Sequence, residues 1–151
     1  MDRQRTRRRW AVGWAGALLA VLAGCGGGGT DTSTPEALFA SFDAAMRASQ
    51  WERAADLVDY GAQAGAENED LDTAAQGQQK LITARMRDAT IAGLQTWGWP
   101  ADGLTPGVTQ NLGARSMIEA SGGGLTVNLL MAQGAEGWRI VGGVPGMLAG
   151  P

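Results

Sequence analysis

Apolar side chains recur at helical spacing from position 38 onwards. Thr34 is a favourable N-cap, Pro35 suits the first helical position, and the Glu36 carboxylate favours the positive end of the helix dipole. The apolar residues that follow fall on one helix face: Leu38, Phe39, Phe42, Ala45 and Met46. This spacing predicts an amphipathic first helix.

A second amphipathic helix is predicted after Ser49, which can serve as its N-cap. Its apolar residues share one side: Trp51, Ala54, Ala55, Leu57 and Val58. Its acidic residues share the opposite side: Glu52, Asp56 and Asp59. Such an acidic stripe is typical of a solvated helix face, and Tyr60 is also expected to point away from Trp51.

The third and longest helix is predicted over residues 72–97. Thr73 with Gln76 fits a capping box, while Gly98 and Pro100 provide the stop signal. A broad inner stripe is expected from six residues: Ala75, Leu81, Ile82, Met86, Ala89 and Trp97. Basic residues are expected outside this stripe or at its edge: Lys80, Arg85 and Arg87.

After Pro106 the pattern changes to the period of two that is typical of strands. Strands are predicted over 114–120, 125–131 and 138–141, with glycine-containing turns between them, and none is predicted after Gly143. Consecutive strands with short turns give an antiparallel meander. The chain is therefore expected to form one α+β domain, with the N-terminal helices packed on one face of a C-terminal antiparallel sheet.

The N-terminal stretch has a different pattern, in which basic residues precede an apolar run. Five arginines lie before the run from Trp10 to Ala23, which is the plan of a secretory signal peptide. The sequence Leu22-Ala23-Gly24-Cys25 resembles the lipobox of bacterial lipoproteins. This resemblance implies a signal peptide over 1–24, lipidation of Cys25, a flexible tether over 25–33 and a single domain over 34–151. A membrane-spanning helix would need about 20 apolar residues, more than this run provides.

Other interpretations of the leader are a twin-arginine export signal, which residues 6–10 resemble weakly, and a stray cysteine after an ordinary cleavage site. Four glycines after Cys25 could also form a phosphate-binding loop, but no Lys-Ser/Thr ending follows. Gly26 stands where an aspartate would resemble an inner-membrane retention signal. The expected location is the periplasmic face of the outer membrane in a diderm bacterium, and otherwise the outer face of the cell membrane.

Charge and composition limit the chemistry of the exported domain. The leader holds five of the 12 basic and one of the 15 acidic residues, so the remaining chain has a net charge of about −7. This charge argues against binding to nucleic acid. The chain has no histidine and one cysteine, which excludes Ser-His-Asp and Cys-His catalysis and most zinc sites. No cofactor or metal is expected. Acidic residues between 67 and 72 lack the spacing of a calcium loop and are better placed before a helix.

The order of elements resembles the nuclear transport factor 2-like superfamily, a cone-shaped α+β fold, and in particular its small tethered members in bacterial lipoproteins. The resemblance is carried by Thr34-Pro35-Glu36 with Phe39 and Phe42, by Ser49-Gln50-Trp51-Glu52-Arg53-Ala54-Ala55, and by Gly137-Trp138-Arg139-Ile140. It implies a cone that can hold a small apolar ligand, and in some members an isomerase or cyclase that uses an Asp or His base.

Three functions follow as hypotheses. An enzyme of the isomerase or cyclase kind is disfavoured, because histidine is absent and Asp56, Asp59 and Tyr60 are expected to face away from the cone. A ligand pocket, or simply a filled core, would be lined by seven residues: Phe39, Phe42, Met46, Trp51, Met86, Trp97 and Trp138. A protein interface would use Trp97 and Trp99, which flank Gly98 at the helix end. We therefore expect a non-enzymatic domain of the cell envelope that binds a small ligand or a protein.

Overall fold

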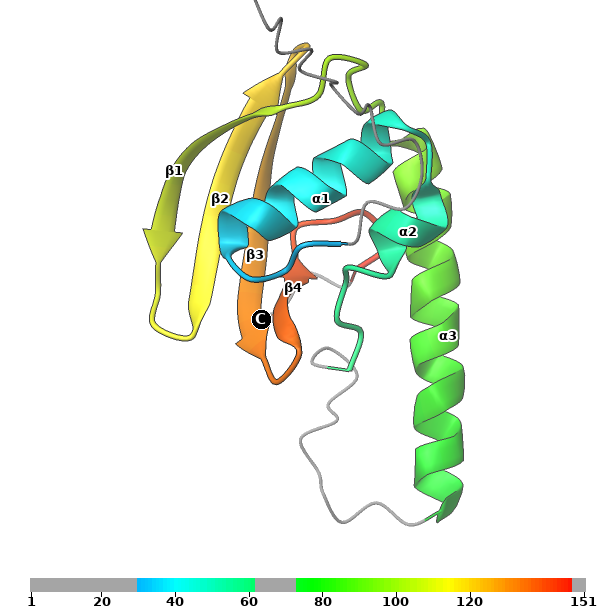
Figure 1. Cartoon of the computed structure of the whole chain (residues 1–151). Helices are drawn as coiled ribbons and strands as arrows, with labels where there is room; N and C mark the ends of the chain where they lie inside the picture. The colour runs from blue at the N-terminus through cyan, green and yellow to red at the C-terminus, as the bar shows by residue number, and fades with distance from the viewer. Residues whose placement is uncertain (1–29, 62–72, 148–151) are drawn as a thin grey trace, which may run out of the picture.

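The computed structural model describes residues 30–61 and 73–147, which form three helices and one four-stranded sheet. The helices precede the strands, as expected for an α+β domain (Figure 1). In chain order the elements are α1 (Pro35–Arg47), α2 (Trp51–Ala55), α3 (Thr73–Thr96), β1 (Thr105–Asn111), β2 (Arg115–Gly122), β3 (Leu125–Gly134) and β4 (Gly137–Gly142).

The sheet is an antiparallel meander with the strand order β1-β2-β3-β4. The strands expected over 114–120, 125–131 and 138–141 are confirmed as β2, β3 and β4. Strand β1 was not expected, because it contains Pro106 and Gly107, has no buried side chain and is interrupted by a bulge between Pro106 and Thr109. An edge strand of this kind carries no alternation of buried and exposed residues.

Helix α1 lies across one face of the sheet and provides much of the core (Figure 1). Its expected cap is confirmed, since Thr34 Oγ1 accepts a hydrogen bond from the Ala37 amide at 3.1 Å and Pro35 occupies the first turn. All five residues of its expected apolar stripe are buried. They pack with the inward side chains of the sheet, chiefly Ile118, Val127, Leu129, Met131 and Ile140.

Helix α2 ends earlier than the sequence predicts. It stops at Ala55, and Ser49 does not cap it, because Ser49 adopts a left-handed backbone with φ 56° and Gln50 precedes the helix. The following residues instead pair with β4 as a short extended segment. The Ile140 amide donates to Leu57 O at 3.0 Å, and the Asp59 amide donates to Ile140 O at 2.8 Å. The helical geometry expected for Leu57 to Tyr60 is therefore wrong.

Helix α3 has the expected extent, but its expected inner stripe is confirmed only at Met86 and Trp97, which pack against the core, while the side chain of Ala75 lies outside what the structure describes. Leu81 and Ile82 are 63% and 41% exposed, and Ala89 is exposed as well, whereas Thr90 and Leu94 are fully buried. For Leu81 and Ile82 Figure 1 shows the reason, since the N-terminal half of α3 extends beyond the sheet. Only the other half has the domain core beside it, so apolar residues near the N-terminal end have nothing to pack against.

Two residues before position 34, Asp31 and Thr32, make hydrogen bonds to the domain. Ser41 Oγ donates to Asp31 O, and the Trp138 amide donates to Thr32 O at 2.8 Å. The described contacts of the domain thus begin at Asp31, within the stretch expected to be a tether. The predicted signal peptide, Cys25, the residues 67–72 and the capping role of Thr73 lie outside what the structure describes.

Among the described residues, no helix combines the length and apolar content that a membrane span requires.

Candidate binding groove

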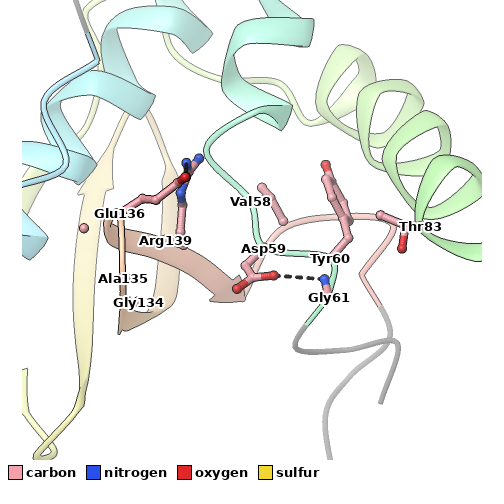
Figure 2. A pocket seen from close by; sticks show the side chains of 10 residues that line it. Val58, Asp59, Tyr60, Gly61, Thr83, Gly134, Ala135, Glu136 and Arg139 are labelled. Carbon is pink, nitrogen blue, oxygen red and sulfur yellow. Dashed lines mark hydrogen bonds and ion pairs between the residues drawn. The ribbon is translucent and has the colours of Figure 1, made fainter. Parts of the chain in front are cut away.

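Two adjoining hollows lie between α3, the segment after α2 and the β3–β4 turn, and Figure 2 shows the one beside β4. They share Gly61 and Thr83, have volumes of about 490 and 500 Å³, and open to solvent. We call them together the α3–β4 groove. Its lining comprises Val58, Asp59, Tyr60, Gly61, Gln76, Gln79, Lys80, Thr83, Ala84, Arg87, Gly134, Ala135, Glu136, Gly137 and Arg139.

Charged side chains of both signs line the groove near β4. The guanidinium of Arg139 donates to Asp56 O at 2.7 Å and to Glu136 Oε2 at 3.4 Å. The Asp59 carboxylate accepts a hydrogen bond from the Gly61 amide at 2.9 Å, as Figure 2 shows, which is the geometry of an Asx turn. Glu136 thus presents its carboxylate beside the Arg139 guanidinium, and Asp59 presents a second carboxylate that is oriented by the Gly61 amide.

The wall along α3 is basic. The Arg87 guanidinium donates to Asp56 Oδ1 at 2.8 and 3.1 Å, which joins α3 to the end of α2. The hydrogen bond to the Asp56 carboxylate raises the pKa of Arg87. Lys80 lies nearly two turns earlier on the same helix and is exposed. A bound chain carrying charges of both signs would therefore meet complementary groups along this groove.

Tyr60 separates the groove from the core. Its ring is 6% exposed, and its hydroxyl donates to Ala55 O at 3.1 Å. Burial raises the pKa of Tyr60. The expectation that Tyr60 points away from the core is wrong, because the helix that would have turned it outward ends at Ala55. The neighbouring Thr90 hydroxyl is buried and has no hydrogen-bond partner among the described residues.

The seven residues expected to line a pocket or fill a core lie in or against the core. Phe39, Phe42 and Met46 are buried, and the others are half-buried and pack against the same cluster: Trp51, Met86, Trp97 and Trp138. None of them lines the α3–β4 groove. These side chains therefore belong to the core or its edge and not to the open groove.

The two tryptophans expected at an interface are also partly covered. Trp99 packs edge-on against Phe42 with a centroid distance of 5.6 Å, and its Nε1 donates to Asp43 Oδ1 at 2.9 Å. Trp97 packs against Trp99 at 5.1 Å. The two tryptophans thus pack the segment after α3 against α1, and neither is fully exposed at the surface.

Asp43 was missed by the sequence analysis. Its Oδ1 accepts hydrogen bonds from both Trp99 Nε1 and the Leu104 amide, each at 2.9 Å, and Arg47 lies 3.8 Å from Oδ2. Gly103 passes so close that a Cβ there would lie 2.6 Å from Asp43 Oδ2. An aspartate in mid-helix gives no signal by itself, because its partners lie more than 50 residues away along the chain.

Among the described residues, no group of three or more Cys, Asp or Glu side chains is arranged to hold a metal ion. Comparison of the chain with protein-family models, with curated proteins and with solved structures found no match. The nuclear transport factor 2-like resemblance and the lipobox therefore stay predictions from the sequence motifs.

Proposed function

We propose that this chain is a lipid-anchored protein of the bacterial cell envelope whose domain binds an extended segment of another envelope protein in the α3–β4 groove. The observation that carries the proposal is the contrast between the groove and the interior. The groove is open and lined by charged side chains of both signs, whereas the aromatic residues suited to a small apolar ligand pack in or against the core.

A groove of this kind favours a polypeptide over a small apolar molecule. Pockets for apolar ligands are concave, mostly apolar and bury most of the ligand surface. Here Asp59, Glu136 and Arg139 lie along one wall and Lys80 along the other. Charged groups at a solvated surface contribute mainly to specificity and to the rate of association. Retention at the membrane would raise the local concentration of the domain, so a modest affinity suffices.

The enzymatic alternative of the isomerase or cyclase kind has less support. Such chemistry needs an acid or base that can reach a substrate in a sheltered site. The buried acidic groups of the described residues, Asp43 and Tyr60, are already engaged in structural hydrogen bonds to the Trp99 indole, the Leu104 amide and Ala55 O. Of the groove carboxylates, Glu136 lies at the open surface, and the half-buried Asp59 carboxylate already accepts a hydrogen bond from the Gly61 amide.

The anchor is tested by Cys25→Ala in the full chain. Metabolic labelling with a fatty-acid analogue should modify the wild type, which should fractionate with membranes after export. The variant should carry no label and be recovered in the soluble envelope fraction. An unlabelled wild type, or a variant that stays on the membrane, would contradict lipidation at Cys25.

The groove is tested separately by charge reversal. Lys80→Glu and Glu136→Lys each reverse one charge of the groove, while Arg115→Glu and Glu119→Lys make matched changes at exposed positions on the sheet. Protein cross-linked to the wild type in intact envelopes should be lost from both groove variants and retained by both controls. Equal recovery from all four variants would locate binding elsewhere, whatever the result for Cys25.

A further inference from the structure

The outward face of α3 carries a stripe of four exposed residues. Leu81, Arg85, Asp88 and Ala92 are spaced at i, i+4, i+7 and i+11, so they lie on one side of the helix. Buried Thr90 and Leu94 lie on the opposite side, toward the core. The stripe is therefore as far from the rest of the domain as this helix permits.

The stripe includes apolar surface that the described domain leaves in water. Leu81 is 63% exposed, and Ile82, at its flank, is 41% exposed. They are two of the four large apolar side chains that are exposed among the described residues. Because both lie on the half of α3 that extends beyond the sheet in Figure 1, no described element covers them.

The charged residues of the stripe are Arg85 and Asp88, and both are exposed. Neither Arg85 nor Asp88 forms an ion pair within the described part of the chain. Their order on the helix, with the cation nearer the N-terminus, is the less favourable one for pairing within a helix. Both side chains are hydrated, and each is free of an ion pair with a described residue that a contact with another chain would have to break.

The order of the four residues fits a second copy of the same stripe. We infer that two copies of this chain associate through α3 in an antiparallel pair with a two-fold axis between positions 86 and 87. In this arrangement Leu81 of each copy faces Ala92 of the other, and Arg85 of each faces Asp88 of the other. The symmetry makes both contacts twice, which is the self-complementarity that a two-fold interface requires. Ile82 lies at the edge of the contact.

The interface is small. The stripe from position 81 to position 92 is about 16 Å long, so a pair of such stripes buries less than the roughly 1,600 Å² of a standard interface. We therefore expect a weak dimer that forms at the high local concentration of a membrane surface and dissociates on dilution. This inference concerns a different surface from the α3–β4 groove and does not depend on what the groove binds.

Cysteine cross-linking of the full chain in native membranes tests the register of the inferred α3 pair. The inferred pair places position 81 of one copy opposite position 92 of the other, at the distance of two packed helices, about 8–10 Å between axes. Positions 81 and 92 within one helix are about 16 Å apart, too far for a disulfide. The double variant Leu81→Cys/Ala92→Cys should therefore give a cross-linked dimer with mild oxidant or a short thiol linker. Each single variant should give no more dimer than the wild type, which controls for Cys25.

Charge reversal in the double-cysteine background provides the second measurement. Arg85→Asp alone and Asp88→Arg alone should each lower the dimer yield at least threefold, and the two together should restore it. Arg115→Glu is the control and should leave the yield unchanged. The inference is overturned if the double-cysteine variant stays monomeric while its thermal unfolding matches the wild type. It is also overturned if the single variants cross-link equally well, or if the product has the mass of a complex with a different protein.

Discussion

At the scale of single residues, Asp43 determines how the segment between α3 and β1 is attached. Its carboxylate is largely buried in the face of α1 that meets this segment, and one oxygen accepts two hydrogen bonds. Both donors, the Trp99 indole and the Leu104 amide, would otherwise be removed from water without a partner. Leaving a buried donor without an acceptor costs more free energy than forming the hydrogen bond contributes to stability.

Asp43→Ala is therefore expected to lower the free energy of unfolding by about 2–3 kcal/mol, because the buried Leu104 amide and the part-buried Trp99 indole lose their acceptor. Urea unfolding followed by tryptophan fluorescence measures this loss. Asp43→Asn keeps an acceptor oxygen and should lose less. Asp102→Ala removes an exposed carboxylate from the same segment and should stay within about 0.5 kcal/mol of wild type. Equal stability of Asp43→Ala and Asp102→Ala would contradict the role assigned to Asp43.

The sequence predicts which apolar residues of α1 are buried, but it does not predict the positions and hydrogen-bond partners of single polar residues. The apolar positions of α1 follow from their spacing, since each needs only its own helix to be placed. Asp43 and Tyr60 could not be placed in this way. The position of Asp43 depends on partners distant in sequence, and that of Tyr60 depends on the exact residue at which α2 ends. Helix ends are the least predictable part of a helical pattern.

At the scale of elements, α3 shows that a helix can be predicted correctly while its buried face is not. Its start and end agree with the sequence to within one residue, whereas Leu81 and Ile82 were assigned to the wrong side. Periodicity identifies which residues share a face. It does not say how far along the helix the core extends, because that depends on where the sheet lies.

Two substitutions on α3 compare how much each half of the helix contributes to stability. Leu94→Ala removes a fully buried side chain and should destabilise the domain by about 2–4 kcal/mol through lost burial and the cavity left behind. Leu81→Ala should change the stability by no more than about 0.5 kcal/mol when measured at low protein concentration. Chemical denaturation of both variants provides the comparison. A loss at Leu81 equal to that at Leu94 would mean that the N-terminal half of α3 is packed within the monomer.

Strand β1 is the element that the sequence did not reveal, and the reason is its position. Of the three strands that were predicted, β2 and β3 bury alternate side chains, which creates their period of two, and β4 buries Ile140. Strand β1 lies at the edge of the sheet, has no buried side chain, and contains Pro106 and Gly107. An edge strand is held by backbone pairing, which leaves little trace in composition.

At the scale of the whole molecule, the two edge strands of the sheet differ in whether their outer backbone groups are paired. The β4 edge is closed by segments from the other end of the chain. The Trp138 amide donates to Thr32 O, and the Ile140 amide donates to Leu57 O. The β1 edge has no neighbouring strand among the described residues, and its protection comes from Pro106 and the bulge that follows. The antiparallel meander could be predicted from the sequence, but the closure of β4 could not, because Leu57 was expected to be helical.

This asymmetry predicts the pattern of amide hydrogen exchange. The Trp138 and Ile140 amides lie on an outer strand, yet they should exchange as slowly as amides in the middle of β2 and β3, because each is bonded across the closed edge. The Val108 amide, in the bulge of the open edge, should exchange at least about 100-fold faster, since local opening there disrupts no buried contact. Exchange measured residue by residue by NMR at low protein concentration tests both statements. Fast exchange at Ile140 would contradict the pairing with Leu57, whereas slow exchange at Val108 would mean that the β1 edge is covered by another chain.

The closed edge also supports the proposed binding in the α3–β4 groove. The backbone of β4 is already paired at Trp138 and Ile140, so a partner at this side of the domain cannot add a strand there and must contact side chains in the groove.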